Sequence, residues 1–410
     1  MHMKSKIPLF VVGGLVVVAF IGAMSAGASP FRAAENSDKV DVLVSFDRTP
    51  GPAEEKIIRA FGGTVSYTYR ITPAIAATLP QAAVNGILHN PHVTAVELDS
   101  EVYATATELD NSWGVKRIGA GIVHNGGNKG LGIKIGIIDS GVNYTHPDLD
   151  GVYAGGYDFV QDDNDPMDVY GHGTHVAGTA CAEENGFGVV GVAPGCALYA
   201  LRVLNNSGVG SWGRTIAAMD WAVANDLQVV NLSLGSSKNP GTAVKTAFDN
   251  VEAAGVVIVA AAGNSGNTAG KGSNIIYPAK YASVIAVGAT DSTDTRASFS
   301  STGSELEIMA PGVSVLSTWN DSTSSSNPQP ICVGGVCYYK YGSGTSMASP
   351  HVAGVAALVI AKGITDENGN NRINDEVRQI MNSTARDLGT AGRDPQYGYG
   401  LVDAVAAVAP

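Results

Sequence analysis

The chain has 410 residues, of which 45% are hydrophobic and only 15% are charged, and its formal net charge is −12. This length exceeds that of one average domain, and the hydrophobic share is typical of a well-packed globular protein. The acidic balance argues against nucleic acid or an anionic membrane surface as a partner.

The N-terminus has the features of a secretion signal. Lys4 and Lys6 precede an apolar run over 7–24, and the small residues 26–28 (A-G-A) offer a cleavage site. We expect residues 1–28 to be removed and the protein to be extracellular, with no stable membrane association afterwards. An uncleaved anchor is the alternative, because the apolar run is about long enough to cross a bilayer.

The next segment predicts a small α+β domain. Between residues 40 and 98, strand-like and amphipathic helical stretches follow in the order βαββαβ, which is typical of a ferredoxin-like (split βαβ) unit. An acidic linker follows, so we place this domain with its linker at 29–107. The expected strands are 40–46, 64–69, 75–79 and 93–98, and the expected helices are 52–61 and 81–89.

From Trp113 onward, patterns of buried strands alternate with helical ones. This alternation predicts an α/β domain, placed at 108–410, with a parallel sheet covered by helices on both faces. Reactive groups gather at the carboxyl ends of the strands in such sheets. The expected strands are 133–138, 198–203, 229–233, 256–261 and 284–287, and the expected helices are 174–182, 211–225, 243–254 and 349–362.

Three segments carry residues suited to nucleophilic catalysis. An apolar strand ends at Asp139 in D-S-G-V, His172 opens a helix in G-H-G-T-H-V-A-G, and Ser346 precedes an apolar helix in G-T-S-M-A-S-P-H. A serine at a helix N-terminus can be a nucleophile if a base is near, and a His oriented by an Asp supplies that base. A turn Asp and a Ser N-cap are the ordinary alternatives, and a His172/His175 zinc pair competes for the second motif.

Asn264 follows another buried strand, in A-A-A-G-N-S-G, where its amide could donate to an oxyanion or simply occupy a turn. Together with this Asn, the three motifs in the order Asp, His, Ser make the chain resemble the subtilisin-like serine proteases. The resemblance covers Trp113–Pro410, while residues 40–104 resemble that family's inhibitory pro-domain more weakly. The intact G-H-G-T-H motif separates the chain from the sedolisins, which use a Glu as base.

The resemblance implies a seven-stranded-type parallel sheet and a monomeric, broadly specific endopeptidase that acts on polypeptides. Its pro-domain would assist folding, be cut off between Tyr103 and Glu108, and remain as an inhibitor. Ser346 would attack the scissile carbonyl, with His172 as base and then acid. Asp139 would hold the tautomer of His172, and Asn264 with the N–H of Ser346 would bind the oxyanion.

The same resemblance implies the substrate contacts. Ser233-Leu234-Gly235 would pair with the peptide backbone by β-augmentation. Ala261-Ala262-Gly263 would form one wall of the pocket for the residue before the cut. Because these wall residues are small, we expect a roomy pocket that prefers large apolar side chains.

Calcium is the cofactor that the resemblance implies. Asp148 would be a ligand, joined by Asn185 and by the main-chain carbonyls of Glu183, Phe187 and Val189. Two further loops are candidates from their own residues. One crowds four acids into a turn and is either a cation site or a solvated loop, and the other resembles an EF-hand loop, although it has Asn371 at position six and Val377 at position twelve. The residues concerned are Asp162, Asp163, Asp165 and Asp168 in the first loop, and Asp366, Asn368 and Asn370 in the second.

Four cysteines in an exported chain suggest disulfides, and three pairings are possible. Close spacing favours Cys181–Cys196 and Cys332–Cys337. Two other functions compete with a broad endopeptidase: a catalytically silent binding protein on the same scaffold, and a dedicated processing protease. The complete set of catalytic motifs argues against the first, and the lack of a recognisable acidic pocket in the matched segments argues against the second.

Overall fold

The computed structural model describes residues 39–99, 108–320, 331–333 and 336–409 of the chain. Contacts divide the protein into two compact units, Met1–Ala104 and Thr105–Pro410. The expected signal segment 1–28 and the linker residues 100–107 lie outside the described residues. Within the described part, no helix is both long and apolar enough to cross a membrane.

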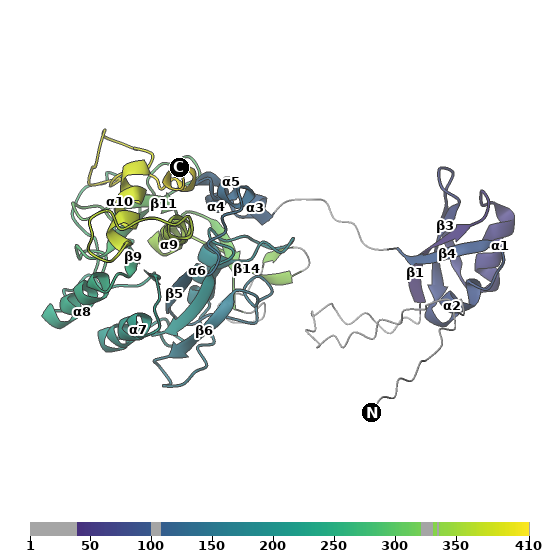
Figure 1. The fold of residues 1–410 in the computed structure, drawn as a ribbon, viewed down its shortest axis with the longest axis horizontal. Helices are drawn as coiled ribbons and strands as arrows, with labels where there is room; N and C mark the ends of the chain where they lie inside the picture. Colours follow the sequence, from purple (N-terminus) through teal and green to yellow (C-terminus); the bar gives the residue numbers. More distant parts are fainter. Residues whose placement is uncertain (1–38, 100–107, 321–330, 334–335, 410) are drawn as a thin grey trace, which may run out of the picture. The chain divides into compact units, whose positions relative to one another are not determined.

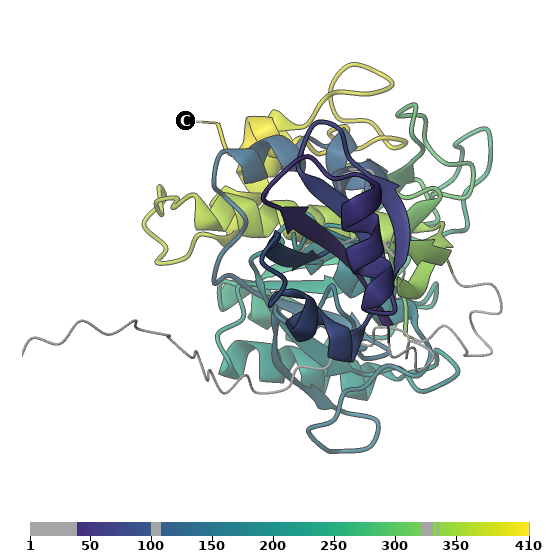
Figure 2. The ribbon, with the colours of Figure 1, turned by 90° about the vertical axis from the view of Figure 1, so that its right-hand side faces the viewer.

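The first unit is the predicted α+β domain. Its four strands form an antiparallel sheet in the order β2-β3-β1-β4, and its helices pack on this sheet through a small apolar core that includes Val44, Ile58 and Ile87 (Figures 1 and 2). The order of elements confirms the predicted βαββαβ pattern. The elements are β1 (Lys39–Phe46), α1 (Pro52–Ala60), β2 (Thr64–Thr68), β3 (Ala74–Pro80), the short 3₁₀ helix Gln81–Ala83, α2 (Val84–Ile87) and β4 (Val93–Leu98).

A seven-stranded sheet organises the second unit, as predicted. All neighbouring strands run parallel, in the order β11-β10-β9-β8-β5-β7-β6. The middle strands are continuous apolar runs because both of their faces are covered. The strands are β5 (Lys134–Asp139), β6 (Tyr153–Asp158), β7 (Ala197–Arg202), β8 (Val229–Leu232), β9 (Val257–Ala261), β10 (Ile285–Thr290) and β11 (Ile308–Pro311).

Helices cover the sheet on both faces, because alternate side chains of each strand enter different cores. On β5, Ile135 and Ile137 join the core with α6 (His172–Cys181) and α9 (Thr345–Ala361). Ile138 joins the core with α7 (Trp212–Ala224) and α8 (Thr242–Ala253), which lie together in Figure 1. The other helices are α3 (Glu108–Asn111), α4 (Trp113–Arg117), α5 (Ala120–Asn125), α10 (Asn374–Thr384) and α11 (Ala404–Ala407).

Two strands of this sheet were missing from the sequence prediction. β6 reads Y-A-G-G-Y-D, so its glycine pair hides the strand pattern, and β11 has only four residues. Both lie at the edges of the sheet, where pairing depends on the neighbouring strand rather than on an apolar run. A separate three-stranded antiparallel sheet was also missed, with the order β12 (Val315–Thr318), β14 (Val336–Gly342) and β13 (Ile331–Val333).

Helix α9 begins four residues earlier than predicted, at Thr345 rather than at Ser349. Pro350 therefore lies inside the helix and not in its first turn. A proline there removes the hydrogen bond from its own nitrogen to the carbonyl four residues before it, which belongs to Ser346. This carbonyl finds another partner in the site described below.

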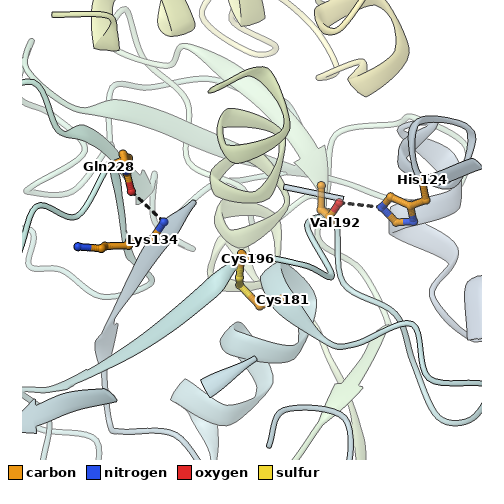
Figure 3. Close-up of a disulfide and its surroundings, with 6 residues drawn as sticks. All are labelled: His124, Lys134, Cys181, Val192, Cys196 and Gln228. Carbon is orange, nitrogen blue, oxygen red and sulfur yellow. Dashed lines mark hydrogen bonds between the residues drawn. A yellow bond between two sulfur atoms is a disulfide. The ribbon is translucent and has the colours of Figure 1, made fainter. Parts of the chain in front are cut away.

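The predicted Cys181–Cys196 disulfide is present in the structure (Figure 3). It joins the last residue of α6 to the residue before β7, and both cysteines are buried. Cys332 is also disulfide-bonded. Its predicted partner Cys337 has a side chain that lies outside the described part of the structure.

Candidate active site

Asp139 and His172 meet at the carboxyl edge of the sheet. Asp139 is the last residue of β5 and is fully buried, whereas His172 is the first residue of α6 and its side chain is 23% exposed. Nδ1 of His172 lies 2.8 Å from Oδ1 of Asp139. Gly173 allows this approach, since a Cβ there would lie 2.1 Å from the carbonyl oxygen of Gly141.

The carboxylate of Asp139 raises the pKa of the His172 imidazole. Burial lowers the pKa of His172, but the charge of Asp139 and its hydrogen bond outweigh burial, so the pKa lies above its ordinary value. Asp168 adds a smaller effect in the same direction. Because Nδ1 is bound to Asp139, Nε2 is the nitrogen that can exchange a proton with a reacting group.

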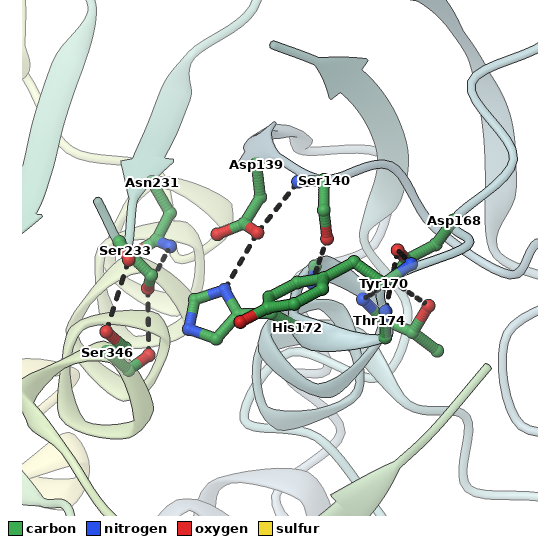
Figure 4. A network of polar contacts seen from close by, with 11 residues as sticks. Asp139, Ser140, Asp168, Tyr170, His172, Thr174, Asn231, Ser233 and Ser346 are labelled. Carbon is green, nitrogen blue, oxygen red and sulfur yellow. Dashed lines mark hydrogen bonds and ion pairs between the residues drawn. The ribbon is translucent and has the colours of Figure 1, made fainter. Parts of the chain in front are cut away.

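Ser346 lies in the first turn of α9, on the other side of the imidazole from Asp139 (Figure 4). Its hydroxyl donates to the carbonyl of Ser233 at 3.1 Å in this structure. The hydroxyl of Ser233 in turn donates to the carbonyl of Ser346 at 2.8 Å. This second bond satisfies the carbonyl that Pro350 leaves without a helical partner. The hydroxyl of Ser233 thus replaces the N–H that a proline at position 350 lacks.

Two further residues, Asn231 and Ser349, extend this hydrogen-bond network. Nδ2 of Asn231, at the centre of β8, donates to the hydroxyl of Ser233 at 3.0 Å. Oδ1 of the same amide accepts from the hydroxyl of Ser349 at 2.6 Å. Asn231 and Ser349 are fully buried, so the network fixes the start of α9 against the end of β8. The sequence analysis did not identify either residue.

Asn264 is exposed just beyond β9, and its Oδ1 accepts from both the N–H and the hydroxyl of Thr345, at 2.9 and 3.0 Å. These contacts orient the amide so that Nδ2 is its free donor end. A Cβ added to Gly344 would lie 3.3 Å from this nitrogen, so Nδ2 is close to the turn before Ser346. The structure therefore brings all four predicted catalytic residues to one region.

A cavity of about 410 Å³ opens beside His172. The predicted substrate strand Ser233-Leu234-Gly235 forms one side of it. Gly235 has no room for a side chain, because a Cβ would lie 2.3 Å from the carbonyl oxygen of Tyr277. The residues of the predicted wall, Ala261-Ala262-Gly263, are buried and directly precede Asn264 in the chain. The remaining lining residues are Tyr170, Leu204, Gly208, Val209, Gly210, Ser211, Trp212, Thr215 and Ser236.

His175 is not arranged as a metal ligand. Its Nε2 lies 3.1 and 3.0 Å from the carbonyl oxygens of Val315 and Lys340, and burial lowers its pKa to about 3. Among the described residues, no three His, Cys, Asp or Glu side chains form a group that could hold a metal by themselves. The structure therefore gives no support to a His172/His175 zinc pair.

Comparison with known proteins fits this geometry. Residues 130–400 match the Subtilase family of peptidases. The chain is 40% identical to subtilisin E of Bacillus subtilis (strain 168) over 404 residues, which cover 97% of each protein. It is 47% identical to subtilisin DY of Bacillus licheniformis over 295 residues, which cover 72% of this chain and 97% of that protein. The M-protease of Shouchella clausii (strain KSM-K16) is 40% identical over 341 residues, covering 83% of this chain and 80% of that protein.

The chain belongs to the subtilase family. It is a subtilisin-type serine endopeptidase, a protease that acts on polypeptides. The similarity to subtilisin E extends through the N-terminal region as well as the peptidase domain. Its relatives are named as subtilisins and alkaline proteases.

The loop after α6 of this subtilase meets two buried carboxylates. Asp148 is fully buried, and its Oδ2 accepts from the N–H of Val189 and the hydroxyl of Tyr339, both at 3.0 Å. Burial raises the pKa of Asp148 to about 7, and the charge of Glu108 adds to the effect. Nδ2 of Asn185 reaches Oδ1 of Asp148 at 3.5 Å.

Glu108 is a member of this group that the sequence analysis missed. Its Oε1 accepts the N–H groups of Asn185, Gly186 and Phe187, in the loop that contains the predicted calcium ligands. Burial raises the pKa of Glu108 as well. The side chain of Glu183 instead accepts the N–H of Gly151 at 2.7 Å. Glu108 was missed because it lies at the domain boundary, 40 residues before Asp148, and no local motif marks it.

The acidic loop before His172 does not gather its carboxylates. Both carboxylate oxygens of Asp168 accept hydrogen bonds at the start of α6. The donors are the N–H groups of Tyr170, Gly171 and Thr174 and the hydroxyl of Thr174. The other three acids have separate partners, so the structure lends no support to a cation in this loop. Asp162 accepts from Tyr157, Asp163 from the N–H of Asp165, and Asp165 from Tyr144.

Proposed function

We propose that Asp139, His172 and Ser346 are the catalytic triad of this endopeptidase and that Asn264 completes its oxyanion hole. The observation that carries the proposal is the 2.8 Å contact between His172 and Asp139, with the first turn of α9 on the far side of the imidazole. A base oriented in this way, next to a serine at a helix N-terminus, is the arrangement needed for acyl transfer.

The steps follow from the atoms available. Asp139 holds Nδ1–H, so Nε2 of His172 is the lone-pair end that accepts the proton of the Ser346 hydroxyl. For this transfer the hydroxyl has to leave the Ser233 carbonyl and turn to the imidazole; contacts of this kind often tighten only when substrate binds. The serine oxygen then attacks the peptide carbonyl, and protonated His172 returns the proton to the leaving amine. Water attacks the acyl-enzyme by the same route in reverse.

The negative charge that develops on the carbonyl oxygen needs fixed donors. Nδ2 of Asn264 is available because Thr345 occupies its Oδ1. The N–H of Ser346 lies in the first turn of α9, where backbone N–H groups have no intrahelical acceptor and the helix dipole favours an anion. Neither donor has to reorganise during the reaction, which is the condition for strong transition-state stabilisation.

For substrate recognition we propose that residues 233–235 pair with the peptide backbone and that residues 261–263 border the pocket for the side chain before the cut. The exposed edge at Gly235 and the small wall residues support a roomy apolar pocket. A panel of peptides that differ only at this position should give the highest kcat/KM with large apolar or aromatic residues. A preference for Lys or Arg would contradict this specificity.

We also propose that the protein is secreted as a zymogen, with residues 1–28 as signal and 29–107 as pro-domain and linker. Support comes from the separate α+β unit and from similarity to subtilisin E that includes the N-terminal region. Parallel sheets fold slowly because their contacts are non-local, so a segment that assists folding has a physical purpose.

Calcium is proposed at the loop next to Asp148 and Glu108. The donor set fits a hard divalent cation, because it offers carboxylates, the Asn185 amide and main-chain carbonyls of the loop and no soft ligand. Burial raises the pKa values of both carboxylates, and a cation bound next to them would favour their charged forms. A bound calcium ion would neutralise the charge of the two carboxylates and link helix α3, which contains Glu108, to the loop.

One experiment tests the triad and the zymogen together. The purified full-length chain and its Ser346→Ala variant are incubated with calcium and weighed by mass spectrometry. We expect the wild type to lose roughly its first hundred residues while the variant stays whole. If both stay whole under folding conditions, and a serine-reactive fluorophosphonate does not label the wild type, the catalytic proposal fails and a silent binding scaffold replaces it.

A further inference from the structure

The loop between α9 and α10 closes around the carboxylate of Asp366. Its Oδ1 accepts the N–H groups of Gly369 and Asn370 at 2.7 and 3.2 Å, and its Oδ2 accepts the N–H of Asn371 at 2.7 Å. Asn371 has φ of +63°, the left-handed conformation that an EF-hand loop requires at its sixth position and that Asn tolerates. The non-glycine at position six is therefore compatible with a cation-binding turn.

The first turn of α10 supplies two more carboxylates to this loop. Oε1 of Glu376 accepts from the N–H of Glu367 at 3.2 Å and from the amide of Asn368 at 2.9 Å. Oδ2 of Asp375 accepts from the amides of Asn368 and Asn370, at 2.6 and 3.0 Å. Position twelve of the loop is an apolar residue, but positions ten and eleven are carboxylates that turn back to the loop.

Two carboxylate oxygens of this cluster lack a hydrogen-bond partner. Glu376 is only 6% exposed, yet its Oε2 has no hydrogen-bond partner, and Oδ1 of Asp375 is buried and unpaired as well. Burial of such atoms without a partner is costly.

Among the described residues, no basic side chain pairs with these carboxylates. None of the ion pairs between described side chains involves Asp366, Asp375 or Glu376. Arg372, inside the loop itself, points instead to Glu252, whose carbonyl it reaches at 3.2 Å and whose carboxylate it reaches at 3.9 Å. A group of carboxylates and amides that excludes the nearest arginine is suited to a cation from solvent.

We propose that this loop is a second divalent-cation site, selective for Ca²⁺, with ligands from Asp366, Asn368, Asn370 and the carboxylates of Asp375 and Glu376. All donors are oxygens, and the several carboxylate and amide groups that the loop offers favour the larger ion and its irregular coordination over Mg²⁺. On binding, the Asn368 and Asn370 amides would turn their oxygens inward, releasing the carboxylates that they now contact.

The function of the site would be structural. It would tie the loop to the first turn of α10, whose residues Val377 and Met381 enter the main core. No three acidic side chains among the described residues are grouped tightly enough to hold a metal by themselves, so the site depends on the Asn oxygens and on closure of the loop. The proposal is independent of the catalytic assignment and of the Asp148 site.

Calcium stoichiometry provides the test. The Ser346→Ala chain, which is expected not to digest itself, is used as the background, and bound Ca²⁺ is counted by equilibrium dialysis. We expect Asp366→Asn and Glu376→Gln each to lose one bound Ca²⁺ per chain. Glu367→Gln, which removes an exposed charge from the same loop, should lose none. Unchanged stoichiometry in both site variants would overturn the proposal.

Two further measurements keep the test decisive if a variant folds poorly. In the parent chain, Ca²⁺ should slow hydrogen exchange of the amides of residues 367–372, whereas Mg²⁺ at the same concentration should not. For Glu376→Gln, the Tm should fall by about 2–4 °C in calcium and should not fall in chelator. If the Tm falls equally in chelator, or if hydrogen exchange in this loop does not change with calcium, Glu376 has only a structural role.

Discussion

The hydroxyl of Ser233 donates to the carbonyl of Ser346 at 2.8 Å, at the one position in α9 where Pro350 removes the normal helical donor. The proposed substrate strand and the proposed nucleophile are therefore joined by a side-chain bond, in addition to the bond that the Ser346 hydroxyl makes to the Ser233 carbonyl. The Ser233 hydroxyl replaces the hydrogen bond that the proline removes.

Replacing Ser233 by Ala should harm catalysis through position rather than through chemistry. The substitution leaves the Ser346 carbonyl and Nδ2 of Asn231 without these partners, which typically costs about 1–3 kcal/mol for a buried group. We expect a lower kcat and a lower Tm, measured by peptide hydrolysis and thermal unfolding. Ser236→Ala is the matched control, because that hydroxyl lines the same cavity and accepts only the N–H of Lys238. Equal effects of the two substitutions would show that the Ser233 bond is unimportant.

Asn264→Ala should lower kcat with little change in KM. The amide contributes mainly when the carbonyl oxygen becomes negative, and loss of one such donor costs about 10²–10³ in rate. Steady-state kinetics with one peptide substrate separates the two constants. Ser265→Ala, at the adjacent exposed position, should have nearly wild-type kcat; a comparable loss there would mean that the loop, and not the amide, is responsible.

Activity should rise with pH as His172 loses its proton. Since Asp139 raises the pKa of His172 above its ordinary value, the rising limb of kcat/KM should lie above the pH of a free imidazole and then level off. Replacing Asp139 by Asn removes the charge that stabilises the imidazolium, so the limb should move to lower pH while the plateau drops by about 10⁴-fold. A limb that does not move would contradict the coupling between the two residues.

Chelation should destabilise the protein through Asp148. In the Ser346→Ala background with calcium, we expect Asp148→Asn to have a lower Tm than the parent, because a ligand is lost. In chelator the difference should shrink or reverse, since the Asn carries no buried charge to be compensated. Thermal unfolding in both conditions provides the comparison. Asp150→Asn, two residues away and exposed, should show no such dependence on calcium.

The disulfide is expected to stabilise the second unit measurably. Cys181 and Cys196 are 15 residues apart in sequence, and closing a loop of that size contributes about 3 kcal/mol in the chain-entropy description. The double substitution Cys181→Ala/Cys196→Ala should therefore lower the unfolding free energy in denaturant by that order. An unchanged unfolding midpoint would show that the surrounding buried packing alone holds α6 against β7.

The fold class and the candidate triad could be predicted from local patterns in the chain. Asp139, His172 and Ser346 each stand at the junction of an apolar run with a glycine-rich turn, and such junctions are local signals in the chain. The same holds for the middle strands of the sheet, whose burial on both faces requires continuous apolar residues. The edge strand β6 escaped prediction because its Tyr153–Asp158 segment contains no such run.

Contacts between residues that are distant in the chain could not be predicted in this way. Glu108 joins the Asp148 loop, Ser233 replaces the donor that Pro350 lacks, and the carboxylates of α10 turn back to Asp366. None of these pairings has a fixed spacing in the chain. Each is set by the way strands and helices pack, because a buried carbonyl or carboxylate must find its partner wherever the fold brings one.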